Sequence, residues 1–457
     1  MRILLCLVVY ASVFALKTEA HDGEHPPKKV APSEHYRPTA MPCRIILTWS
    51  GDPSTTQSVT WRTDTTVARA FAEVIEADSG PIDAKKACRV IASTSPFESS
   101  LFKTHAHSAT FIDLKPATRY AYRVGDDVNW SEWLQFSTAS AEPQPFSFIY
   151  FGDAQNDLRS MWSRVIRESQ RDQPKSAFFL HAGDLINNAD DDAQWGEWFE
   201  AGGFLNGMIP SLPTPGNHEY ASEKSKDGKI VKRWLSKNWN LQFTLPQNGP
   251  EGFAETCYYI DYQGVRFVSL NSNEGPLRQV EWLDSVLRSN TNRWTICTFH
   301  HPIYSTAKDR DNPEIRAAWK PIFDQYRVDL VLTGHDHTYG RTGLEVPRNV
   351  STGLNTQSKE SGTVYVVSVS GPKMYALDEK NRSEFRRVAE DTQLYQLVTV
   401  DNDEIRFEAK TAKGELYDAF TLKKRPGAIN ELIERRPETS ERLRPKKTLE
   451  VKLQESK

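Results

Sequence analysis

Four apolar runs of strand length, each followed by a side chain that can bind a metal ion, limit the fold of this chain more narrowly than any other feature. FSFIYFG is followed by Asp153, and SAFFLHAG is followed by Asp184. WTICTF is followed by His300, and LVLTG by His335 and His337. Runs that are apolar throughout are typical of strands covered on both faces. Between them, LRSMWSRVIRES and PLRQVEWLDSVLRS repeat apolar residues with a helical period, which predicts helices and hence an α/β fold.

The polar residues at the ends of these runs are expected to lie close together. In α/β sheets, the carboxyl ends of parallel strands share one edge, and ligands collect there. The loop PTPGNHEY adds Asn217 and His218 to the set. A single Gly-Asp pair is ordinary turn chemistry, and a single histidine is usually a hydrogen-bonded polar residue. Several such segments in one domain favour a shared site over coincidence.

The ligand types indicate a metal centre with two ions. Oxygen and imidazole ligands without thiolate suit Fe, Mn or Zn, and the set holds more ligands than one ion needs. Two ions about 3.5–4 Å apart can clamp a phosphoryl group and activate a water between them. Such a pair needs a carboxylate shared by both ions, and Asp184, in the middle of the set, is our choice.

A different pattern precedes the α/β region. RIILTWS, QSVTWRT, SATFIDL, RYAYRVG and EWLQFST are short alternating runs separated by turn residues, which predicts a small all-β sandwich. No cluster of metal ligands or nucleophiles appears in these runs, so a packing module is the default interpretation. The expected division of the chain is a signal peptide at 1–20, a linker at 21–40, the sandwich at 41–140, the catalytic domain at 145–424 and a charged, mobile tail at 425–457.

The first residues, MRILLCLVVYASVFALKTEA, place a basic residue before an apolar run and end in the small residue Ala20, as in secretory signal peptides. The protein is therefore expected to be secreted or periplasmic, with no membrane segment after signal removal. A membrane anchor would need about 20 apolar residues. Cleavage leaves Cys43, Cys88, Cys257 and Cys297. A disulfide between Cys43 and Cys88 and free buried thiols are both compatible with the spacing.

The charge distribution excludes some partners. A formal net charge of -3, with acidic and basic residues interspersed, gives no electrostatic footprint for nucleic acid or for an anionic membrane. A small ester-type substrate is more consistent with such a surface. The sequence does not predict the oligomeric state.

The motifs GDAQ, GDLIN, GNHE, FHHP and GHDH, in this order, resemble the signature of calcineurin-like metallophosphoesterases. With the preceding sandwich they resemble the purple acid phosphatases, and the resemblance spans roughly Pro42 to Lys424. It implies a fibronectin-III-like N-terminal domain followed by a four-layer α/β/β/α catalytic domain. It also implies a binuclear enzyme that cleaves phosphate esters by attack of metal-bound hydroxide.

Carried onto this sequence, the family pattern implies a role for each ligand. One ion would be held by Asp153, Asp184 and His337, and the other by Asp184, Asn217, His300 and His335. His218 matches the histidine that protonates the leaving oxygen, a general-acid role. His301 and His181 are expected beside the ligands, and Arg341 is expected in a structural ion pair.

Two departures from the family pattern concern the first ion. The purple enzymes carry a tyrosine three residues after the bridging aspartate, where this chain has Asn187. Many relatives carry a histidine two residues after the first aspartate, where it has Gln155. An amide oxygen of Gln155 or Asn187, or water, would complete the site. Without a tyrosinate, divalent ions and a colourless enzyme are expected, unless Tyr220 or Tyr339 enters from a neighbouring loop.

The expected reaction is hydrolysis of phosphate monoesters, as in acid phosphatases. A phosphodiesterase is the alternative on the same metal core, because pocket shape decides between the two. A third interpretation is a cell-surface binding protein with an inert phosphatase core, which the occupied ligand positions disfavour.

Overall fold

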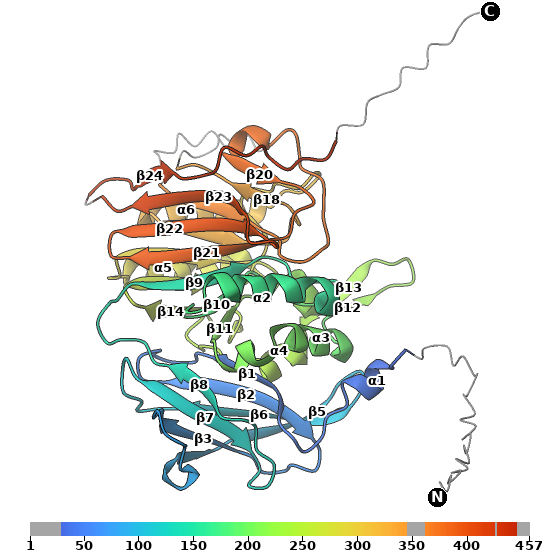
Figure 1. The fold of residues 1–457 in the computed structure, drawn as a ribbon. Coiled ribbons are helices and arrows are strands. Elements are labelled where there is room, and N and C mark those ends of the chain that lie inside the picture. The colour runs from blue at the N-terminus through green and yellow to red at the C-terminus, as the bar shows by residue number, and fades with distance from the viewer. Residues whose placement is uncertain (1–28, 345–361, 426, 446–457) are drawn as a thin grey trace, which may run out of the picture.

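The computed structural model describes residues 29–344, 362–425 and 427–445. The signal peptide predicted at 1–20 lies outside these residues. A β-sandwich comes first and an α/β domain follows it, in the order that the sequence predicts (Figure 1). Among the described residues, no helix is long and apolar enough to cross a membrane.

The N-terminal domain is a sandwich of two four-stranded antiparallel sheets. The alternation in RYAYRVG places Tyr120, Tyr122 and Val124 in the core between the sheets, as the pattern predicts. One sheet has the order β1 (Cys43–Thr48), β2 (Gln57–Asp64), β6 (Lys103–Phe111) and β5 (Ser93–Glu98). The other has the order β4 (Cys88–Ile91), β3 (Phe71–Glu76), β7 (Arg119–Gly125) and β8 (Leu134–Ser137).

The cysteines do not form the disulfide that the spacing allows. Cys43 and Cys88 are free thiols and lie on strands of different sheets. Cys257 and Cys297 are free and buried in the second domain, so the alternative with free buried thiols describes this pair.

Two seven-stranded sheets form the middle of the α/β domain. In the first sheet, the three strands at one edge are parallel and the rest are antiparallel. Its order is β11 (Ser211–Pro213), β10 (Phe179–His181), β9 (Phe146–Phe151), β21 (Leu394–Asp401), β22 (Glu404–Thr411), β23 (Leu416–Lys423) and β24 (Glu431–Glu434). The second sheet has the order β14 (Tyr258–Tyr262), β15 (Val265–Ser269), β16 (Trp294–Thr298), β17 (Leu330–Thr333), β19 (Val364–Val367), β18 (Tyr339–Arg341) and β20 (Arg387–Ala389), and β15, β16, β17 and β19 are parallel.

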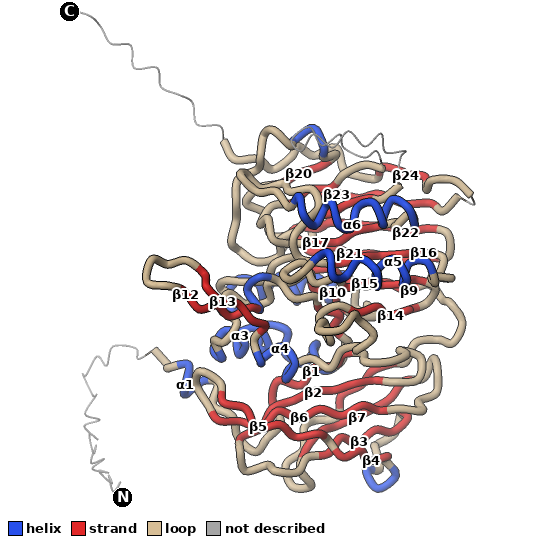
Figure 2. The backbone as a smooth tube through the Cα atoms, turned by 180° about the vertical axis from the view of Figure 1, so that it is seen from behind, coloured by secondary structure: helices blue, strands red, loops and turns tan. Residues whose placement is uncertain are grey.

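Helices cover the outer faces of the two sheets, which gives the expected four layers. The helices α2 (Ser163–Asp172) and α3 (Asp192–Gly202) pack on the side of the first sheet, and α5 (Val280–Arg288) and α6 (Pro313–Tyr326) pack on the side of the second (Figures 1 and 2). Aromatic rings pack between the sheets in the centre, where the ring centroid of Phe267 of β15 lies 5.4 Å from that of Phe148 and 5.1 Å from that of Phe178. Burial of these rings is a major source of stability for the domain.

The sandwich is fixed to the α/β domain by buried charges. Arg44 and Arg62 both donate to Asp192 Oδ1, over 2.9 and 3.0 Å, and Asp192 begins α3. The Tyr122 hydroxyl donates to the carbonyl oxygen of Gly207 over 2.6 Å. A change in the domain orientation would leave these buried charges without their partners, which is costly. The contacts therefore favour one orientation of the two domains.

The segment predicted as a linker at 21–40 is partly folded, which corrects that expectation. Pro32–His35 form the short helix α1, and Pro32 stands in its first turn, where a proline ring fits. Tyr36 follows, and its hydroxyl donates to Glu200 Oε2 of α3 over 3.3 Å. The helix is too short to show an apolar period, so the sequence pattern did not reveal it.

The tail expected to be mobile at 425–457 is also partly folded, and the expectation is wrong for 427–445. Glu431–Glu434 form β24, which pairs with β23 at the edge of the first sheet. The buried guanidinium of Arg341 donates to Glu434 Oε2 over 2.8 Å and to Asp418 Oδ1 over 2.9 Å. Arg341 therefore has the structural role that was expected for it. Residues 446–457 lie outside the described residues.

Candidate metal centre

The ligand-type side chains predicted at the strand ends meet at one edge of the stacked sheets. They follow β9, β10, β11, β16 and β17, and the residues are Asp153, Asp184, Asn217, His218, His300, His335 and His337. Ligand atoms of Asp153, Asp184 and His300 lie within 4.8 Å of one another, and the same holds for His300, His301 and His335. His300 belongs to both groups, so the two groups form one continuous cluster.

Asp184 lies at the centre of this cluster. Its Oδ2 is 3.2 Å from His300 Nε2 and 2.7 Å from Gln155 Nε2, while its Oδ1 accepts the backbone N–H of His218 over 2.8 Å. A Cβ at Gly216 would lie 2.2 Å from Asp184 Oδ1, which explains why the GNHE loop needs a glycine there. Asp184 also adopts a φ of 51°, a conformation that non-glycine residues keep only where the surrounding structure enforces it.

The first group of side chains comprises Asp153, Gln155 and His337. Asp153 Oδ2 accepts the backbone N–H of His335 over 2.6 Å, and its Oδ1 is 3.7 Å from His337 Nε2. His337 Nδ1 donates to the carbonyl oxygen of Lys373 over 2.9 Å, so its Nε2 faces the cluster. Gln155 Nε2 is 3.1 Å from His337 Nε2, and Gln155 Oε1 accepts from Lys373 Nζ over 3.3 Å.

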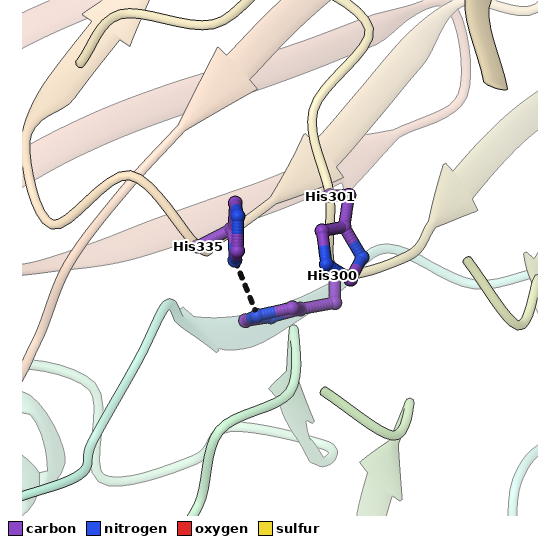
Figure 3. Close-up of side chains that lie close together, drawn as sticks. All are labelled: His300, His301 and His335. Carbon is purple, nitrogen blue, oxygen red and sulfur yellow. Dashed lines mark hydrogen bonds between the residues drawn. The ribbon is translucent and has the colours of Figure 1, made fainter. Parts of the chain in front are cut away.

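The second group comprises Asn217, His300 and His335. Asn217 Oδ1 lies 3.1 Å from His300 Nε2 and 3.0 Å from His335 Nδ1, and these two nitrogens are 3.1 Å apart. Figure 3 shows the close approach of the two rings, with His301 beside them. His300 Nδ1 donates to the carbonyl oxygen of Ala182 over 2.9 Å, which turns its Nε2 toward Asp184. All atoms of this group that can bind a cation thus point to one place.

Glu219 is a member of the site that the sequence reasoning missed. Its carboxylate is fully buried and accepts three backbone N–H groups, from Gly216 over 2.6 Å, from Leu185 over 2.8 Å and from Asp184 over 2.9 Å. Burial raises the pKa of Glu219 to about 7. By tying the GDLIN loop to the GNHE loop, Glu219 fixes the position of Asp184. The available signal was its place directly after Asn217 and His218 in GNHE.

The buried carboxylates make this edge of the sheets favour positive charge. Burial raises the pKa of Asp153 to about 8, although His300 opposes that shift. Burial alone would lower the pKa of His300, but Asp184 and Asp153 raise it to about 9. Burial likewise disfavours ionised Asp184, yet His300 and His218 hold its pKa well below the usual value. A site that binds a proton this strongly also suits a metal cation.

The donor set fits two cations. Among the described residues, buried Asp153 Oδ1 has no hydrogen-bond partner, as expected for a carboxylate oxygen that faces a metal ion. His300 and His337 each use one ring nitrogen for a backbone carbonyl, which is the usual way to orient a metal-binding histidine. Oxygen and imidazole donors without thiolate suit Fe, Mn or Zn.

His218 lies at the mouth of the cluster. Its Nδ1 donates to the backbone carbonyl oxygen of Asn187 over 2.6 Å, and its Nε2 is 3.9 Å from Asp184 Oδ2. Its side chain is 26% exposed, so a substrate can reach it. A hollow of about 630 Å³ opens here, and its lining includes Asn217, His218, His301 and His335.

The remaining candidates, His301 and His181, lie beside the ligands and behind them, respectively. His301 Nδ1 is 2.9 Å from Ser272 Oγ, and its ring is 4.1 Å from that of His335, so it stands beside the ligands. His181 is buried against Phe151 and Trp162, whose ring centroids lie 5.5 and 6.3 Å from its own, and it packs behind the site.

Neither tyrosine named as a substitute ligand donates its hydroxyl to the cluster. The Tyr339 hydroxyl donates to Asp418 over 2.8 Å in the buried ion-pair region around Arg341. The Tyr220 hydroxyl accepts from Asn271 Nδ2 over 2.7 Å. Asn187 contributes its backbone oxygen to His218, and the residue lines the hollow.

The comparisons with known proteins agree with this geometry. The family profile for the purple acid phosphatase N-terminal domain matches residues 42–138, and that for calcineurin-like phosphoesterases matches residues 146–339. Human acid phosphatase type 7 is 28% identical over 340 residues, covering 66% of this chain and 71% of the relative. Purple acid phosphatase 21 of Arabidopsis thaliana is 27% identical over 327 residues, covering 69% and 70%. The structure of purple acid phosphatase PPD1 from yellow lupin seeds superposes with a TM-score of 0.69 at 19% identity, covering 84% of this chain and 74% of that one.

The site and the catalytic-domain match define the chain as a metallophosphoesterase, a hydrolase of phosphoric esters. Because the purple acid phosphatase N-terminal domain precedes that catalytic domain, the chain belongs to the purple acid phosphatase-like calcineurin-type metallophosphoesterases. Enzymes of this family use a binuclear metal centre.

Proposed function

We propose that this protein hydrolyses phosphate monoesters with two divalent metal ions. Asp184 is the shared ligand in this proposal. The first ion is assigned to Asp153, Asp184 and His337, and an amide oxygen of Gln155 or Asn187, or water, completes its shell. The second ion is assigned to Asp184, Asn217, His300 and His335. When bound, the ions neutralise the phosphoryl oxygens and activate water as the nucleophile.

His218 acts as the general acid in this proposal. Its Nδ1 is committed to the carbonyl oxygen of Asn187, so the proton that it transfers is held on Nε2, which faces the site. The leaving oxygen of the substrate takes that proton as the ester bond breaks. Glu219 and Gly216 do not touch the substrate, and their part is to keep Asp184 in place.

The observation that carries the proposal is the central position of Asp184. Its Oδ2 lies 2.7 Å from Gln155 of the first group and 3.2 Å from His300 of the second, which is where an oxygen shared by two ions must stand. The preference for monoesters rests on the relatives, which are named acid phosphatases. A diesterase would use the same ligands, so the substrate test below includes diesters.

The test is a comparison of the wild-type protein and His218→Ala on 4-nitrophenyl phosphate and on bis(4-nitrophenyl) phosphate. We expect the wild-type protein to prefer the monoester, and we expect the variant to keep its metal while turnover falls about 10²- to 10⁴-fold. A preference for the diester would contradict the assigned substrate class. Loss of metal from His218→Ala would make His218 a ligand rather than the acid.

The proposal includes export of the protein from the cytoplasm. Its support is the pattern of residues 1–20, with cleavage expected after Ala20. Under this proposal the mature chain begins at His21, which N-terminal sequencing of the exported protein would show.

A further inference from the structure

A β-hairpin forms one wall of the hollow beside His218. The strands β12 (Tyr220–Lys224) and β13 (Ile230–Leu235) follow the GNHE loop and project from the body of the catalytic domain (Figures 1 and 2). Ser222 pairs with Arg233, and Lys224 pairs with Ile230 across the hairpin. Side chains that are directly paired in this way share one face of a two-stranded sheet. All four residues line the hollow.

The leaving group of a substrate must lie along this wall. The general acid has to stand beside the leaving oxygen, and His218 lines the same hollow as the hairpin. The volume of about 630 Å³ is within the range of about 300–1,000 Å³ that is typical of sites for organic ligands. The hollow therefore has room for a leaving group as well as for the transferred phosphoryl group.

Two cations on this wall are available to an anion. Arg233 Nη2 donates to the backbone oxygen of Asn217 over 2.7 Å, and the guanidinium carbon lies 5.1 Å from the centre of the Tyr220 ring. These contacts orient Arg233 and leave its other N–H groups for a ligand. Within the described part of the chain, neither Arg233 nor Lys224 forms an ion pair.

The acidic residues in the hollow are occupied by other donors. Asp190 accepts from the Ser236 hydroxyl over 2.6 Å, and Asp191 caps α3 by accepting the N–H of Ala193 over 2.9 Å. Neither carboxylate is within ion-pair distance of Lys224 or Arg233 in the described residues. The wall formed by β12 and β13 therefore carries unpaired positive charge toward the position of the leaving group.

We propose that Lys224 and Arg233 make this enzyme prefer phosphate esters whose leaving group carries a second anionic group, as in sugar bisphosphates. This inference rests on the proposed phosphatase function, because it assigns the side chains that bind the leaving group of that reaction. Arg233 binds the second anion through its oriented N–H groups, and Lys224 adds charge at the outer end of the wall. Ile230, which is 57% exposed, offers apolar contact to the carbon skeleton between the two anions.

The test compares glucose 1,6-bisphosphate with glucose 6-phosphate, which differ by one phosphate. We expect Lys224→Ala and Arg233→Ala each to lower kcat/KM for the bisphosphate by about 3- to 10-fold, and to change that for glucose 6-phosphate by less than about 2-fold. Lys232→Ala is the matched control, because Lys232 pairs with Glu223 on the opposite face of the same hairpin. We expect this control to leave both values unchanged.

Salt and metal content separate this role from a structural one. Raising the ionic strength from about 0.01 M to about 0.15 M shortens the Debye length from about 30 to about 8 Å. The preference for the bisphosphate should shrink over this range in the wild type and stay flat in a Lys224→Ala/Arg233→Ala double variant. Metal content should be the same in the wild type, Lys224→Ala and Lys232→Ala, because neither lysine supplies or contacts a ligand in the proposal.

The outcomes distinguish the two proposals. If the metal-loaded wild type hydrolyses neither the two sugar phosphates nor 4-nitrophenyl phosphate, the proposed function is overturned, and the inference with it. Hydrolysis of both sugar phosphates with equal kcat/KM would overturn only the inference. An equal loss on both substrates in Arg233→Ala, or the same loss in Lys232→Ala, would also overturn it.

Discussion

Asp184 shows how much of this site depends on a single side chain. Its carboxylate contacts His300 and Gln155 through Oδ2 and the backbone N–H of His218 through Oδ1. The backbone N–H of Asp184 itself donates to Glu219. The residue bears positive φ, so its position is enforced by these contacts rather than by local preference. Changes at Asp184 should therefore affect both ions at once.

Asp184→Asn keeps the shape of the side chain and removes its charge. We expect it to release most of the metal and to lower metal affinity more than 100-fold, since even residues that only orient ligands contribute about 10- to 100-fold. Turnover of 4-nitrophenyl phosphate should fall with the metal content. The assignment of Asp184 as the shared ligand fails if the variant retains both full metal content and near-normal turnover.

The absence of a tyrosine three residues after Asp184 predicts the colour of the enzyme. Tyr220 and Tyr339 use their hydroxyls on Asn271 and Asp418, so neither replaces the family tyrosine at Asn187. A tyrosinate on ferric iron absorbs strongly in the visible range, whereas an amide oxygen does not. We expect the active, metal-loaded protein to be essentially colourless in a visible absorption spectrum. An intense purple band would show that a tyrosinate binds ferric iron here.

At the scale of secondary structure, β24 explains why the charged C-terminal segment folds. Its Glu434 is 39% exposed and pairs with fully buried Arg341, which also holds fully buried Asp418. Glu434 thus adds a second carboxylate to an ion pair that joins the two sheets, between Arg341 of β18 and Asp418 of β23. The strand and the ion pair support one another.

This arrangement predicts unequal costs for two substitutions. Arg341→Met leaves Asp418 buried without its cation, and we expect it to destabilise the protein by about 3–5 kcal/mol. Glu434→Gln removes a partly exposed partner, and we expect a loss within about 1 kcal/mol. Urea unfolding of both variants gives the comparison. Equal small losses would mean that Arg341 is not the centre of this cluster.

Four of the five strands that lead into the site, β9, β10, β16 and β17, could be predicted from the sequence, because each is an apolar run followed by a polar residue. The fifth, β11, has only three residues and shows no such run. The three strands β21, β22 and β23 were not predicted, although EIRFEAKT carries a readable alternation in which Ile405, Phe407 and Ala409 are buried. By contrast, no local pattern indicates β24. Its position depends on pairing with β23 and on the contact of Glu434 with Arg341, which lies far away in the sequence.

The same distinction holds within the site. The ligands could be listed from motifs, but their partners come from distant segments that only the fold brings together. Lys373 reaches Gln155 from the loop after β19, and Arg310 donates to the backbone oxygen of His335 over 2.7 Å. Local sequence could not predict either contact, because each joins residues from separate strands and loops.

At the scale of the whole molecule, the sandwich supports the catalytic domain without entering the site. His105 and His107, on β6, use their ring nitrogens within the sandwich, on the Val67 carbonyl and on the hydroxyls of Thr63 and Thr94. Among the described residues, every group able to hold a metal ion lies in the catalytic domain. The contacts of Arg44 and Arg62 with Asp192 then link the sandwich to α3, away from the ligands.

The central claim is that one chain holds two metal ions at the edge shared by the two sheets. The most direct measurement is the metal content of the purified, active enzyme by mass spectrometry, taken together with turnover during chelation and reloading. We predict two ions per chain, loss of turnover as they are removed, and recovery only when the second equivalent is returned. Full turnover with one ion or none per chain would contradict the binuclear site.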